Sequence, residues 1–144
     1  MGNRAYFTVT SKEPLPKTYY MHWNGGMDTF APLCRAIFDN NVQSTEQLIA
    51  FLQHLELKPQ LQDHYAASTW LEENGHYYID LQKQTLDHQA ENQTMRQWVP
   101  HLKEAFESYV NKRIRAECRD SVRQEYWQGI IAEAGKFFSQ KQGA

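Results

Sequence analysis

The sequence predicts an α+β fold in which two antiparallel β-hairpins form one sheet and helices pack against it, in the order ββααββα. Three observations predict this class: alternating apolar residues before residue 25 and again in 68–81, two helical apolar stripes in 28–55, and a long helical C-terminal region. A length of 144 residues suits a single domain, 1–144, with an α+β part at 1–94 and a helical part at 95–144.

The first hairpin is expected over residues 4–24. Apolar and polar residues alternate over 4–10, which predicts a strand with one buried face. Pro14-Leu15-Pro16 is a connection, because proline has no N–H to donate to a sheet. The second strand, 17–24, alternates in the same way, with Tyr19, Met21 and Trp23 on one face and Tyr20, His22 and Asn24 on the other.

Two helices are expected next. Asn24-Gly25-Gly26 turns the chain, and Asp28 is the predicted N-cap of a helix that runs to about Asp39. A second helix begins at Ser44, which is spaced from Gln47 as in a capping box. Each has one apolar face, formed by Phe30, Leu33, Cys34, Ile37 and Phe38 in the first and by Leu48, Phe51, Leu52 and Leu55 in the second.

The second hairpin is expected around Asn74-Gly75, a favoured type I′ turn dipeptide. Counting outward from this turn pairs Trp70 with Ile79 and Glu72 with Tyr77. His76 and Asp80 then share a strand face as a surface pair. Residues 82–94 contain many glutamines and few apolar side chains, which predicts an exposed connector.

The C-terminal region carries an apolar residue at every fourth position from Trp98 to Phe138. Such a repeat drifts by about 40° per step around an α-helix, so no single flat partner can bury it along one straight helix. The sequence therefore predicts either a break at Asp120-Ser121 or a long helix wrapped by a partner chain. Both alternatives leave more apolar surface than two small hairpins cover, which favours a homodimer.

Composition excludes several classes of protein. No apolar run approaches the roughly 20 residues of a membrane helix, and no signal-peptide pattern is found, so no membrane association and a cytoplasmic location are expected. Cys34 and Cys118 are far apart, and the six histidines have no zinc-site spacing. No metal, cofactor or catalytic residue is therefore assigned.

Two surfaces are candidates for binding. The corner from His22 to Asp28 is either a structural turn or a ligand or partner site, since a helix start offers free N–H groups. A small-molecule pocket or an enzyme that uses His22 and Asn24 is the alternative. A second alternative is nucleic-acid binding through the basic face formed by Lys112, Arg115, Arg119 and Arg123, although acidic residues interleave with it as on many solvated helices.

Gly2-Asn3-Arg4-Ala5, followed by His22-Trp23-Asn24-Gly25-Gly26 and Asp28, resembles a family of small uncharacterised proteins of phages, plasmids and mobile gene cassettes. The resemblance covers about the first quarter of the chain and implies a bacterial accessory protein, with no established activity. We therefore expect a non-enzymatic binding protein of a mobile element. Its candidate site residues are Arg4, His22, Trp23, Asn24, Gly25, Gly26 and Asp28, with Arg4 and Asn24 expected in one local network.

Overall fold

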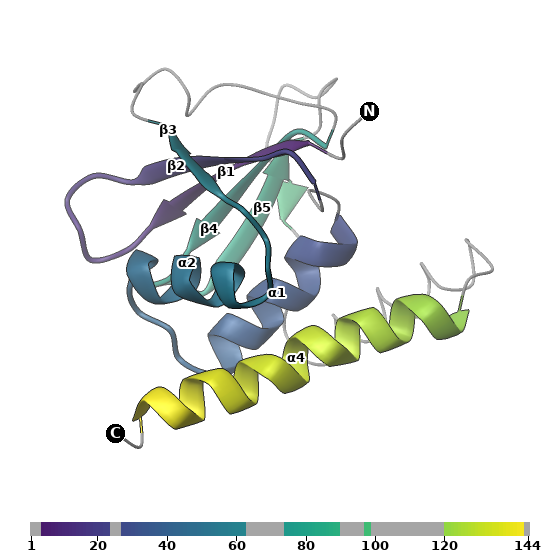
Figure 1. Ribbon diagram of the computed structural model, residues 1–144. Helices are drawn as coiled ribbons and strands as arrows, with labels where there is room; N and C mark the ends of the chain where they lie inside the picture. Colours follow the sequence, from purple (N-terminus) through teal and green to yellow (C-terminus); the bar gives the residue numbers. More distant parts are fainter. Residues whose placement is uncertain (1–3, 24–26, 63–73, 90–96, 99–119, 143–144) are drawn as a thin grey trace.

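The computed structural model describes residues 4–23, 27–62, 74–89, 97–98 and 120–142. Its elements are β1 (Ala5–Thr10), β2 (Lys17–Met21), α1 (Met27–Asp39), α2 (Thr45–His54), β3 (Gln60–Gln62), β4 (His76–Asp80), β5 (Thr85–Gln89), β6 (Gln97–Trp98) and α4 (Asp120–Gln142). The strands form one mixed sheet in the order β3-β2-β1-β4-β5-β6. Figure 1 shows the helices on one side of this sheet, with α4 farthest from it. The α+β class is confirmed.

The first hairpin is confirmed, because β1 pairs antiparallel with β2 and brings Phe7 opposite Tyr19. The alternation works as expected: Ala5, Phe7 and Val9 are all buried against the helices. The strand β2 ends at Met21, however, earlier than predicted. The prediction that Trp23 shares the buried face of Tyr19 is therefore wrong, since Trp23 lies beyond the strand and is exposed.

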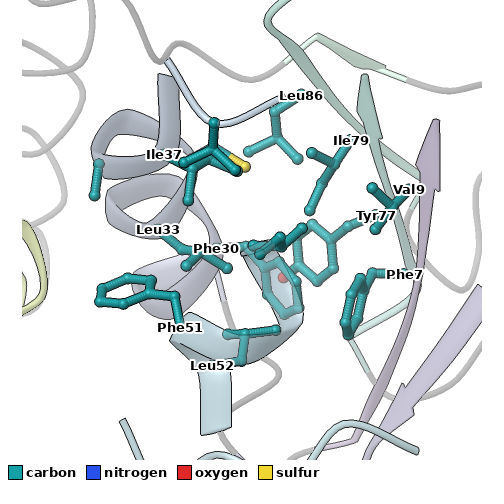
Figure 2. Packing of buried hydrophobic residues seen from close by; sticks show 14 of the residues in the cluster. Phe7, Val9, Phe30, Leu33, Ile37, Phe51, Leu52, Tyr77, Ile79 and Leu86 are labelled. Carbon is teal, nitrogen blue, oxygen red and sulfur yellow. The ribbon is translucent and has the colours of Figure 1, made fainter. Parts of the chain in front are cut away.

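The core lies between the sheet and α1 and α2, as Figure 2 shows. Phe30 of α1 stacks on Tyr77 of β4 with ring centroids 4.0 Å apart, and the predicted apolar face of α1 is buried throughout. Ser44 caps α2 as expected, since its side chain accepts a hydrogen bond of 3.1 Å from the Gln47 N–H. Local sequence patterns therefore predict both helices correctly.

The pairing of β4 differs from the prediction. Its two edges are occupied by β1, in parallel, and by β5, antiparallel. Ile79 lies opposite Val9 and Leu86, so the hairpin pairing of Ile79 with Trp70 is wrong. Residues 82–94 are not all connector either, because Thr85–Gln89 forms β5 and Leu86 is fully buried.

The helix α4 packs on α1 and α2. Ile130, Ala134 and Phe138 follow the predicted four-residue spacing and are buried. Phe51 of α2 meets Phe137 and Phe138 with ring centroids 5.5 and 5.3 Å apart. This end of the apolar stripe therefore packs within the chain. The predicted break at Asp120-Ser121 borders residues outside the described ranges, and the homodimer stays a prediction. Within the described ranges, no helix combines the length and apolar character needed to span a membrane.

Candidate binding groove beside Trp23

His22 and Trp23 follow the end of β2 and point away from the core. The Tyr20 hydroxyl and His22 Nδ1 are hydrogen-bonded at 3.0 Å, which fixes the imidazole over the end of the strand. The rings of His22 and Trp23 pack in a T-shaped arrangement, with their centroids 4.9 Å apart. Trp23 is nevertheless 58% exposed. An indole held by its neighbour but open to solvent is a ready contact surface.

The opposite wall comes from the segment between α2 and β3. At the end of α2, the Leu57 N–H donates to the Leu52 carbonyl at 2.9 Å and the Glu56 N–H donates to the Gln53 carbonyl at 3.0 Å. This is a Schellman motif, in which the residue after the C-cap adopts a left-handed conformation. Here that residue is Glu56, with φ of 63°. The motif buries Leu57 and directs the chain toward β3.

Pairing of β3 with β2 then brings this wall beside Trp23. Gln60 lies opposite Tyr20, two residues before His22. The result is a cavity of about 510 Å³, lined by His22, Trp23, Glu56, Leu57, Lys58 and Gln60. A second hollow of about 610 Å³ shares Glu56, Leu57 and Lys58 with it and extends to Gln53 and Pro59. We call the two together the Trp23 groove.

The groove carries both signs of charge. Glu56 and Lys58 are exposed, and neither side chain makes an ion pair or hydrogen bond to any of the residues that the structure describes. His22 adds a group that donates and accepts. Such side chains are suited to binding and orienting a ligand, whereas nucleophilic catalysis needs a nucleophile held against its own base.

The other predicted site residues are only partly placed. The Arg4 carbonyl accepts hydrogen bonds from Asn74, through its backbone N–H at 3.0 Å and its side-chain Nδ2 at 3.1 Å. Asn24, Gly25 and Gly26 lie outside the described residues, so the expected network of Arg4 with Asn24 is untested. The helix α1 begins at Met27, and Asp28 is therefore inside its first turn rather than the N-cap before it. Of the basic face, Lys112, Arg115 and Arg119 also lie outside the described residues, and Arg123 lies on α4.

His76 is a residue whose environment the sequence did not predict. It is fully buried, its Nε2 lies 2.6 Å from Thr8 Oγ1, and Thr8 in turn lies 2.7 Å from Thr18 Oγ1. The prediction that His76 and Asp80 form a pair on the surface is therefore wrong, because His76 is buried. The carboxylate of Asp80 instead accepts from backbone N–H groups of the β4–β5 turn. Alternation along a strand predicts one buried and one exposed face, which would leave His76 exposed beside buried Tyr77. Both residues are buried, so both faces of β4 are covered at this point.

The remaining candidate chemistry is not supported by the geometry. Cys34 is buried in α1, and burial raises the pKa of its thiol well above the usual range, so the thiol stays protonated and is not an activated nucleophile. In the ranges that the structure describes, no group of three or more His, Cys, Asp or Glu side chains is placed to hold a metal. The Trp23 groove is therefore the candidate site.

Comparison of the chain with family models, with curated proteins and with solved structures finds no match in any of the three. The resemblance of the N-terminal motifs to mobile-element proteins thus stays a prediction. Function has to be argued from the groove itself.

Proposed function

We propose that the protein is a non-enzymatic binding protein that recognises its partner through the Trp23 groove. The observation that carries this proposal is the indole of Trp23, which is 58% exposed yet lines a cavity of about 510 Å³. Tryptophan is strongly enriched among the residues that dominate binding energy, because it buries a large rigid surface at a small entropic cost. A mobile-element context remains part of the proposal through the N-terminal motifs alone.

The test is a screen of a mixed library of small molecules and short peptides by NMR on the full-length, ¹⁵N-labelled protein. Binders are expected to shift the indole N–H signal of Trp23, identified with the Trp23→Phe variant, together with the amides of Glu56 and Lys58. Trp23→Ala should abolish these shifts. Leu15→Ala is the matched control, because Leu15 is a second large apolar residue, 77% exposed, in the β1–β2 loop.

Binding that survives Trp23→Ala would refute the proposal. The alternative, a small-molecule pocket or enzyme that uses His22, has one observation in its favour, since His22 lines the same cavity. It predicts that a bound compound is converted during the titration and that His22→Asn stops conversion without stopping binding. Conversion of any library compound would replace the non-enzymatic reading.

A further inference from the structure

The residue that ends α2 indicates what the groove is built to bind. Both α1 and α2 end in the same motif, and the left-handed residue is Asn41 in the first, with φ of 53°, and Glu56 in the second. Asparagine tolerates this conformation, whereas glutamate has a Cβ that clashes there and no compensating local hydrogen bond. A residue that breaks a local preference on the wall of a cavity points to a use for its side chain.

The charges of the groove narrow the class of ligand. Glu56 offers an unpaired carboxylate, Lys58 an unpaired ammonium and Trp23 an open apolar surface, among the described residues. A ligand that complements all of them brings a cation, an anion and an apolar group within one cavity. Polypeptide segments supply these groups on neighbouring side chains. A nucleic acid does not, because its backbone charge is uniformly negative.

The strand β3, beside the groove, indicates what backbone conformation the ligand has. In the described part of the chain, β3 is the outermost strand of the sheet on this side. The register that pairs Tyr20 with Gln60 and Thr18 with Gln62 turns the backbone groups of both glutamines toward β2, which leaves the N–H and C=O of Leu61 facing the outer edge. Leu61 between them is 52% exposed. Backbone groups on a sheet edge are matched by an extended backbone, with side-chain pockets giving specificity.

We propose that an extended segment of another polypeptide binds the Trp23 groove as an added strand along β3. The segment presents a basic side chain to Glu56, an acidic side chain to Lys58 and an apolar side chain to Trp23. This inference rests on the proposed function and names its partner class. The incoming strand exchanges backbone hydrogen bonds with Leu61, whose N–H and C=O face the outer edge of β3.

The test begins with a phage-displayed library of random linear peptides, selected on the full-length protein. Recovered sequences are made as synthetic peptides and titrated by calorimetry. Affinity should fall about tenfold or more in Trp23→Ala and in Glu56→Gly, as expected for central contacts. Asn41→Gly, at the matching position of α1, and Leu15→Ala should leave the affinity unchanged. Glu56→Gly relieves backbone strain, so its loss of affinity cannot be ascribed to unfolding.

Amide hydrogen exchange measured with and without the peptide tests the strand itself. The expected result is slower exchange at the amide of Leu61 in the complex, because this is the β3 amide that faces the outer edge. Peptides that bind the groove without slowing exchange there would overturn the added strand and leave the proposed function standing. Failure to recover any binder sensitive to Trp23→Ala would overturn both. A dimer by light scattering whose Leu61 amide is already protected without peptide would make a second copy the occupant, and would overturn the partner class.

Discussion

Replacing Glu56 with glycine should stabilise the protein while it removes a binding residue. Glu56 sits at φ of 63°, where a residue with a Cβ is strained by about 1–2 kcal/mol. Glycine has no such strain, but it gives the unfolded chain more freedom, at a cost of about 0.4–1 kcal/mol. The midpoints of these two ranges differ by about 0.8 kcal/mol, which is the gain expected in the free energy of unfolding. For a chain of this size, each kcal/mol corresponds to a rise of about 2–4 °C in Tm.

The assay is equilibrium unfolding in urea, followed by circular dichroism, on Glu56→Gly, Glu56→Ala and Asn41→Gly. Alanine retains the Cβ, so Glu56→Ala should gain almost nothing although it removes the same carboxylate. Asn41 has φ of 53° in the equivalent motif, but asparagine tolerates this region, so its replacement should change the free energy of unfolding much less than Glu56→Gly does. Equal denaturant dependence in all variants would show that the unfolded states are comparable.

Two results would refute this reasoning. Destabilisation by Glu56→Gly would mean that the carboxylate makes a stabilising interaction in the folded protein. Equal gains for Glu56→Gly and Glu56→Ala would mean that charge, and not backbone conformation, sets the stability. The predicted pattern, stabilisation together with weaker peptide binding, is instead the exchange of stability for function that a strained binding residue implies.

Three further predictions concern the fold. Ser44→Ala should lower the free energy of unfolding by about 1 kcal/mol, because it removes the N-cap of α2, as measured by urea unfolding. Phe138→Ala should cost about 3 kcal/mol, with exposed Lys136→Ala near zero, since Phe138 is buried against Phe51; equal values would mean that α4 does not pack within the chain. Burial lowers the pKa of His88, so the unfolded chain binds a proton more readily than the folded protein. The free energy of unfolding should therefore fall as pH drops below the ordinary pKa of 6.5. This fall should be shallower in His88→Gln.

The elements that follow local rules could be predicted from the sequence. The alternation in β1, the apolar faces of α1 and α2 and the Ser44 cap each depend on residues within a few positions of one another. The last turns of α4 were predictable for the same reason, because Ile130, Ala134 and Phe138 fall on one helical face. Such signals do not depend on knowing which element packs against which.

The pairing of β4 could not be predicted in this way. Asn74-Gly75 is a strong hairpin signal, and Gly75 does adopt a positive φ of 77°. Here, however, the dipeptide leads β4 alongside β1: the Tyr6 N–H donates to the Gly75 carbonyl at 3.2 Å. A parallel pair joins segments that are distant along the chain, and no local pattern encodes that choice. The strand β5 escaped detection because Leu86 is its single buried apolar residue.

One wall of the Trp23 groove follows from local sequence, and the other depends on strand pairing between distant segments. The motif at His22 and Trp23 was visible in the sequence, yet its opposite wall comes from the end of α2, which only the pairing of β3 with β2 brings near. The one local signal for that wall is a glutamate directly after the helix, where glycine or asparagine is preferred. The comparison between Asn41 and Glu56 gives this signal its meaning, because the same motif ends both helices of one chain. Asn41 satisfies the local preference, and Glu56, which lines the Trp23 groove, does not, which is the pattern expected where binding rather than folding determines the residue.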